Sequence, residues 1–190
     1  MSLKAISITI VLLVAGCASP INQVTMEDYT DKCRSAAQAK NFPVAVEACR
    51  RAWINTRIGN LGPEAESMAL YNLGRVQKNA LIPNDAEISL KRSLELELPL
   101  SGSTSAKVGR RLAELSTVLF AQRRATEGVT FMEQLKPIAP QFEGAERKYV
   151  AGLFYIYADE LRATGSPERA EGFTRFAEGL GVKRSETPGG

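Results

Sequence analysis

A set of small residues returns along this chain at a nearly constant interval. Ala45, Ala86, Gly128 and Ala170 are separated by 41, 42 and 42 positions. A second set precedes each of them by 12 residues and consists of Cys33, Gly74, Ser116 and Ala158. A period in this range indicates repeated structural units that cannot bury their apolar faces alone. Stacking such units buries one continuous core, so the period constrains the fold more than any other feature.

Each unit has the pattern of a helical hairpin. Apolar residues recur at helical spacing, without the alternation that marks strands. Proline and glycine clusters divide the chain into about eight helices and lie at 41–43, 59–63, 83–84, 99–103, 137–140 and 165–167. Small residues at the aligned positions let paired helices approach closely. The sequence therefore predicts an all-α protein, an α-α superhelix of about four helical hairpins over residues 26–181. A non-repeating helical bundle is the alternative.

The units resemble the tetratricopeptide repeat (TPR). The second unit carries the fullest match, at Leu70, Leu73, Gly74, Ala86, Leu90, Ser93 and Pro99. The usual period of this repeat is about 34 residues, and the longer period here is similar to the extended form found in kinesin light chains. The resemblance implies a TPR-like solenoid. Its concave groove, lined mainly by the first helix of each hairpin, would bind peptides or helices of other proteins.

The repeat alignment places candidate groove residues on these first helices. They are Tyr71, Asn72, Arg75, Lys78, Arg110, Phe120, Tyr155 and Asp159. In related repeats an asparagine at the position of Asn72 grips the backbone of the bound peptide, and basic residues nearby can receive a carboxylate. Only Asn72 and Arg110 match that pattern, because the corresponding positions elsewhere hold residues such as Glu114 and Gly152. Arg75 and Lys78 could instead pair with acidic neighbours.

The N-terminus has the parts of an export signal. Lys4 precedes an apolar stretch over residues 5–14, which leads into Val14-Ala15-Gly16-Cys17. This stretch is shorter than the roughly 20 residues of a membrane-spanning helix. It resembles a bacterial lipoprotein signal, which implies cleavage before Cys17, acyl chains on that cysteine and, because Ala18 follows, the outer membrane. An ordinary signal peptide and an N-terminal membrane helix are the alternatives.

These features predict four parts of the chain. They are a lipoprotein signal peptide at 1–16, a lipidated tether at 17–25, the TPR-like domain at 26–181 and a disordered tail at 182–190. Removing residues 1–16 removes one charge, that of Lys4, so the formal net charge falls from +3 to +2. Basic residues stay scattered among acidic ones, and a nucleic-acid partner would need a concentrated basic face. The composition therefore indicates no nucleic-acid partner.

The two remaining cysteines, Cys33 and Cys49, flank the first hairpin turn at similar distances. Such positions lie opposite each other in an antiparallel hairpin. If the protein is exported, its compartment is oxidising, which favours a Cys33–Cys49 disulfide. Two buried free thiols are the alternative. The cysteines form no C-x-x-C pair and the chain contains no histidine, so the sequence indicates neither a metal site nor another cofactor.

The sequence indicates no catalytic residue. Without histidine, Ser-His-Asp and Cys-His nucleophile systems are excluded. Glu66-Ser67 is the kind of pair that lytic transglycosylases carry, but it opens a repeat helix and lacks their glycine-rich and aromatic context. The leading hypothesis is a membrane-anchored, periplasm-facing adaptor or assembly factor that binds another envelope protein or peptide in a pilus, secretion, outer-membrane or cell-wall machine. A peptidoglycan-acting enzyme and a structural subunit of an envelope machine are the alternatives.

Overall fold

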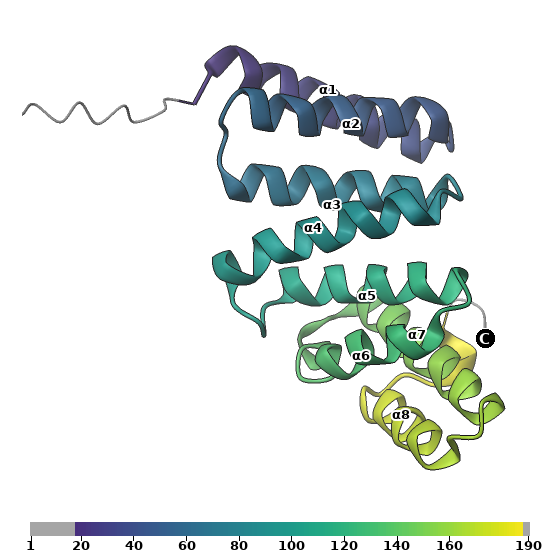
Figure 1. The fold of residues 1–190 in the computed structure, drawn as a ribbon. Helices are drawn as coiled ribbons and strands as arrows, with labels where there is room; N and C mark the ends of the chain where they lie inside the picture. The colour runs from purple at the N-terminus through teal and green to yellow at the C-terminus, as the bar shows by residue number, and fades with distance from the viewer. Residues whose placement is uncertain (1–17, 188–190) are drawn as a thin grey trace, which may run out of the picture.

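A computed structural model describes residues 18–187. The predicted signal peptide, the predicted lipidation site Cys17 and residues 188–190 lie outside the described residues. Residues 18–187 form eight α-helices and two short 3-10 helices, and no strand occurs among them. Figure 1 shows the α-helices as hairpins stacked in chain order. The predicted all-α solenoid of four hairpins is confirmed.

The helices pair with their neighbours along the chain. The hairpins are α1 (Pro20–Gln38) with α2 (Phe42–Ile58), α3 (Pro63–Asn79) with α4 (Pro83–Ser101), α5 (Ala106–Ala121) with α6 (Ala125–Leu135), and α7 (Gly144–Ala163) with α8 (Pro167–Gly179). The 3-10 helix η1 (Ala139–Gln141) lies between α6 and α7, and η2 (Arg184–Glu186) follows α8. Each pair also contacts the next one along the chain.

Local sequence explains where the helices begin and end. Proline occupies the first turn of α1, α2, α3, α4 and α8, where its missing N–H leaves no hydrogen bond unmade. The side chain of Ser105 caps α5 by accepting from the Val108 N–H at 3.2 Å. One break differs from the prediction, because α4 continues through Pro99 to Ser101. Gly102 follows the helix with a φ of 79°, a conformation that glycine adopts readily.

The aligned small residues lie where helices pack closely, either within a hairpin or between neighbouring hairpins. Ala45, Ala86 and Ala170 have no exposed surface. A Cβ atom added at Gly74 would lie 2.6 Å from Leu90 Cγ, and one added at Gly128 would lie 1.8 Å from Tyr157 Oη. A side chain cannot fit at such distances without moving its neighbours. The repeat in the sequence is therefore a repeat of close helix contacts.

The first hairpin has its own apolar cluster. It contains Ala45, Val46 and Cys49 together with residues of α1 and α3, whereas a larger cluster fills the later hairpins. Cys33 of α1 and Cys49 of α2 form a disulfide with their Cα atoms 5.1 Å apart. The predicted disulfide is confirmed.

Both ends of the domain extend beyond the predicted bounds of 26–181. Helix α1 begins at Pro20, within the stretch predicted as a tether, and the Ser19 N–H donates to the Gly59 carbonyl oxygen at 2.9 Å. At the other end, residues 182–187 pack against the protein instead of forming a disordered tail. Val182 is 5% exposed and Thr187 is 9% exposed. These contacts are long-range, so the local polar composition of both stretches gave no indication of them.

Candidate functional site

A groove runs across the first helices of the hairpins. One part, the N-terminal pocket, has a volume of about 650 Å³ and lies between α1 and α3. The other part, the central pocket, has a volume of about 620 Å³ and lies between α3, α5 and the start of α7. Arg75 and Asn79 line both pockets. The two pockets therefore form one surface, which we call the groove.

Aromatic side chains and cations alternate in the central pocket. The Arg75 guanidinium lies 5.4 Å from the centre of the Tyr71 ring, and Lys78 Nζ lies 5.9 Å from that of Tyr149. Arg110 lies 5.9 Å from the centre of the neighbouring Phe142 ring. Aromatic faces attract cations, so these pairs order the long basic side chains along the wall. The wall thus presents flat apolar surfaces beside positively charged groups.

Acidic residues of α5 and α7 contact these cations. Glu114 lies 3.3 Å from Arg75 Nε and 2.5 Å from Lys78 Nζ. Arg110 donates two hydrogen bonds to Glu146, at 2.6 and 3.0 Å, and this contact lowers the pKa of the Glu146 carboxyl. The pairing of Arg75 and Lys78 with an acidic neighbour, one of the two interpretations of the sequence, is confirmed. Two cations share the single carboxylate of Glu114, which leaves one positive charge unbalanced there.

The tyrosines of the central pocket remain protonated at neutral pH. Burial, together with the negative charge of Glu114, raises the pKa of Tyr71 to about 12. Burial also raises the pKa of Tyr149. The Tyr149 hydroxyl lies 2.6 Å from Thr117 Oγ1 of α5. Each phenol can therefore act as a hydrogen-bond donor to a ligand or to a neighbouring side chain.

The structure brings five of the eight predicted groove residues together. Tyr71, Arg75, Lys78 and Arg110 line the central pocket, and Asn72 lines the N-terminal pocket together with Arg75. The central pocket is also lined by Phe142, Glu146 and Tyr149, which are not among the predicted groove residues. Phe142 precedes α7, and the other two belong to its first turns, whereas the alignment placed the groove at the middle of that helix.

The other three predicted residues lie outside both pockets. Phe120 packs against the core, with its ring centre 5.8 Å from that of Tyr157. Residues 182–187 contact both Tyr155 and Asp159 of α7, where Tyr155 is 5% exposed and Asp159 is about half-exposed. The Tyr155 hydroxyl donates to the Val182 carbonyl oxygen at 2.9 Å, and Asp159 accepts from Arg184.

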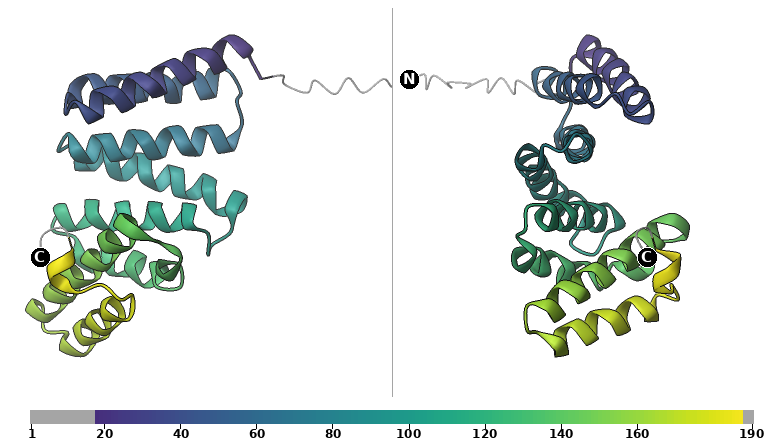
Figure 2. Two further views of the ribbon diagram at one scale, coloured as in Figure 1. Left: turned by 180° about the vertical axis from the view of Figure 1, so that it is seen from behind. Right: turned by 90° about the vertical axis from the view of Figure 1, so that its right-hand side faces the viewer.

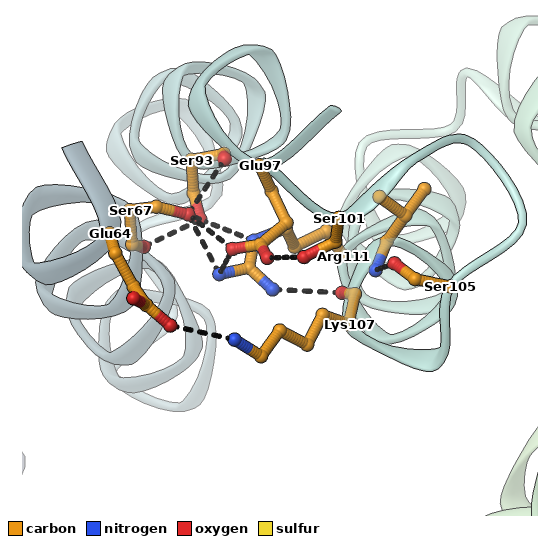
Figure 3. A network of polar contacts seen from close by, with 9 residues as sticks. Glu64, Ser67, Ser93, Glu97, Ser101, Ser105, Lys107 and Arg111 are labelled. Atoms are coloured by element: carbon orange, nitrogen blue, oxygen red, sulfur yellow. Dashed lines mark hydrogen bonds and ion pairs between the residues drawn. The ribbon is translucent and has the colours of Figure 1, made fainter. Parts of the chain in front are cut away.

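Glu66 and Ser67, the pair considered for cell-wall cleavage, have packing partners from other helices. Glu66 accepts from Trp53 Nε1 at 3.5 Å. Ser67 is fully buried and donates to Glu97 at 2.8 Å within a network that includes Arg111 (Figure 3). These contacts join α3 to α2, α4 and α5, so both residues have a structural role at the contacts between hairpins.

Residues 18–187 contain neither a metal-binding cluster nor a membrane-spanning helix. They hold no group of three or more histidine, cysteine, aspartate or glutamate side chains placed to bind a metal ion. In the same range, every helix is too short or too polar to span a bilayer. The groove is therefore the surface that we consider for function.

Solved structures share the fold of this chain. BtubC (BKLC) from P. vanneervenii aligns with a TM-score of 0.72 at 16% sequence identity, over 84% of this chain and 64% of that one. A kinesin light chain-like protein from Podosopora anserina with nearly identical TPR-like repeats gives a TM-score of 0.65 at 15% identity, over 82% of this chain and 74% of that one. This chain thus spans less than two thirds of the length of BtubC. The likeness confirms the predicted TPR-like solenoid and concerns the fold alone.

Comparison by sequence gives no match. No family model fits this chain, and no curated protein is similar to it by sequence.

Proposed function

We propose that this chain is a lipid-anchored, periplasm-facing protein of the bacterial outer membrane that works as a protein-protein interaction adaptor or assembly factor. The groove lined by Tyr71, Arg75, Lys78 and Arg110 carries the proposal, because it combines aromatic faces with cations in a TPR-like solenoid. Such a surface suits a peptide or helix of another envelope protein. The process served would be the assembly of a pilus, a secretion complex, an outer-membrane machine or a cell-wall machine.

The charges of the groove indicate how a ligand would bind. Arg75 is half-exposed, and it shares Glu114 with Lys78. Arg75 would donate a charge-assisted hydrogen bond to a carboxylate of the ligand, while Glu114 stayed paired with Lys78. The partly exposed ring of Tyr149 in the same pocket would receive an apolar side chain of the ligand.

The anchor rests on the lipoprotein-like sequence that ends at Cys17. Two or more acyl chains hold a protein at a membrane stably, whereas one gives only marginal binding. The anchor would be joined to the first hairpin through Ala18 and Ser19, next to the end of α2 at Gly59. The disulfide between α1 and α2 would then secure the hairpin that carries the anchor.

Metabolic labelling with a radioactive fatty acid tests the anchor. The wild-type protein is expected to incorporate label and to fractionate with the outer membrane. Cys17→Ser should abolish incorporation and leave the precursor uncut, which a shift in mass reveals. A labelled Cys17→Ser protein, or a mature wild-type protein without acyl chains, would refute this part of the proposal.

Crosslinking in membranes followed by affinity purification tests the groove. We expect Arg75→Glu and Tyr71→Ala to lower recovery of the bound envelope protein at least tenfold. Arg92→Glu is the matched control, because Arg92 is a similarly exposed arginine on α4, paired with Glu95 and outside both pockets. Equal recovery with all three variants, each shown by circular dichroism to be folded, would refute the groove assignment.

A further inference from the structure

The chain after α8 turns back onto α7. Gly181 has a φ of 73°, a conformation that glycine adopts readily, and it reverses the chain direction at the end of α8. Residues 182–187, which we call the C-terminal segment, then contact α7, as the two views of Figure 2 also indicate. The segment contains the single turn of η2.

Arg184 and Val182 make the polar contacts of this segment. Arg184 donates to both carboxylate oxygens of Asp159, each at 2.9 Å, and its guanidinium lies 5.0 Å from the centre of the Tyr155 ring. The Tyr155 hydroxyl donates to the Val182 carbonyl oxygen at 2.9 Å. Helix α7 thus binds both a side chain and a backbone carbonyl of the segment, as a peptide-binding surface would.

The segment continues along α7 toward the central pocket. A Cβ atom added at Gly152 would lie 3.1 Å from Thr187 Cβ, so the absence of a side chain there leaves room for the segment. One turn earlier on α7, Lys148 Nζ lies 3.9 Å from Glu186. The next residue, Tyr149, lines the central pocket. The C-terminal segment therefore lies beside the groove on the same helix.

The repeat alignment shows that the segment covers groove positions of the fourth hairpin. Counted from the aligned small residues Gly74 and Ala158, the positions of Gly152, Tyr155 and Asp159 correspond to those of Met68, Tyr71 and Arg75. In the second hairpin these three positions line the two pockets. In the fourth hairpin, part of the chain itself occupies them.

We propose that the face of α7 formed by Gly152, Tyr155 and Asp159 is a peptide-binding subsite beside the groove, selective for a turn-forming segment that carries arginine. The C-terminal segment is the displaceable internal ligand of this subsite. This rests on the proposed function, since it takes the groove to be a peptide-binding surface. A partner segment of the same chemistry would replace residues 182–187 and would reach the central pocket along α7.

The contacts explain why the segment can be displaced. Arg184 and Asp159 are each about half-exposed, so water and salt weaken their attraction. Val182 and Thr187 are the segment's buried side chains, and both are small. Ordering the backbone of the segment opposes binding. A longer partner with additional contacts in the central pocket would therefore bind in preference to it.

A synthetic copy of the segment tests the subsite. The probe is a fluorescein-labelled, C-terminally amidated peptide of residues 181–187, Gly-Val-Lys-Arg-Ser-Glu-Thr. The full-length double variant Val182→Asp, Arg184→Glu is designed to release the internal segment, because Val182→Asp puts a carboxylate at a buried apolar position and Arg184→Glu puts one against Asp159. By fluorescence anisotropy, this variant should bind the peptide at least tenfold more tightly than the wild-type chain does. Adding Asp159→Lys to the double variant should abolish this increase in affinity. A peptide that carries Arg184→Glu should bind the resulting triple variant tightly again.

Hydrogen exchange in the same samples reports on the internal segment. The amides of residues 182–187 should exchange at least tenfold faster in the double variant than in the wild-type chain. The proposal is overturned if exchange is unchanged, because the named contacts then do not hold the segment. It is also overturned if the released chain binds the peptide no more tightly than wild type, since the segment is then a fixed cap. Arg92→Glu, on α4 and outside both pockets, should leave affinity for the peptide unchanged. The probe is a copy of this chain's own segment and needs no envelope protein, which separates this test from that of the proposed function.

Discussion

Replacing Glu97 with glutamine should destabilise the protein strongly, because it leaves a buried cation without its anion. Glu97 of α4 and Arg111 of α5 are 2.7 Å apart, and their side chains are 2% and 1% exposed. Figure 3 shows them between α3, α4 and α5, where the second and third hairpins meet. Burial opposes ionisation of Glu97, but hydrogen bonds from Ser101 and Ser67 and the charge of Arg111 outweigh it, so its pKa is lowered.

The magnitude follows from the contacts that remain. After Glu97→Gln, Arg111 still donates to Ser93, Ser67 and the Lys107 carbonyl oxygen at 2.7 to 2.8 Å, yet no buried negative charge balances it. Removing one partner of a buried ion pair costs about 3–5 kcal/mol. For a chain of this length, that corresponds to a fall in melting temperature of roughly 6–20 °C.

The double variant Glu97→Leu, Arg111→Met provides the comparison. It removes both charges, while Ser67 and Ser93 still bond each other's carbonyl oxygens at 3.1 and 2.7 Å. We expect its free energy of unfolding to lie within about 1 kcal/mol of wild type, because apolar residues of similar volume commonly replace a buried ion pair without loss.

Urea unfolding, followed by circular dichroism at 222 nm, measures the free energy of unfolding of each variant through the loss of its helices. Glu97→Leu alone and Arg111→Met alone should each destabilise the protein, so the cycle that they form with the double variant should give a coupling of about 2 kcal/mol or more between the two sites. The reasoning is refuted if Glu97→Gln changes the free energy of unfolding by less than about 1 kcal/mol. It is equally refuted if the two single effects add up to that of the double variant.

Three further predictions concern the hairpins and their charges. Replacing Cys33 and Cys49 with serine should cost about 3 kcal/mol in the free energy of unfolding, because the disulfide closes a loop across a sequence separation of 16; equal melting temperatures with and without reductant would contradict this. Gly128→Ala should cost about 1–3 kcal/mol, since its Cβ would overlap the Tyr157 hydroxyl; Gly172→Ala, at a site with open space, is the control and should not destabilise the chain. Burial disfavours the charged form of Glu87, but hydrogen bonds from Lys91, Arg124 and Gln122 lower its pKa from 4.5 to about 2. The stability that comes from this lowered pKa is therefore present above pH 4.5 and is lost as the pH falls toward 2. The free energy of unfolding should fall by about 1–3 kcal/mol over this range. Urea titrations of Glu87→Gln should lack this part of the pH dependence.

The repeat could be read from the sequence because its physical cause is local. Positions such as Gly74 and Gly128 must be small wherever two helices cross closely, so the spacing of small residues records the spacing of the hairpins. The pairing of Cys33 with Cys49 follows from the same geometry, since an antiparallel hairpin brings symmetric positions together.

The groove could be predicted only in part. The alignment correctly predicted five pocket residues because the first three hairpins stack regularly. These residues are Tyr71, Asn72, Arg75, Lys78 and Arg110. The fourth hairpin contributes the start of α7, so Phe142, Glu146 and Tyr149 enter the central pocket while Tyr155 and Asp159 lie outside it. A packing angle between hairpins depends on side chains distant in sequence, and no local pattern records it.

The sequence by itself determined the fold class, the four hairpins, the positions of close helix contact and the partners of the two cysteines. These properties depend on periodicity and on neighbours along the chain. The tertiary structure decided which cations of the groove have an anionic partner, because Glu114 and Glu146 come from other helices. It also placed Arg111 beside Glu97 in the core. It also placed residues 182–187 on α7, although their composition is that of a solvated tail. Contacts of this kind depend on surfaces that exist only after the hairpins have stacked.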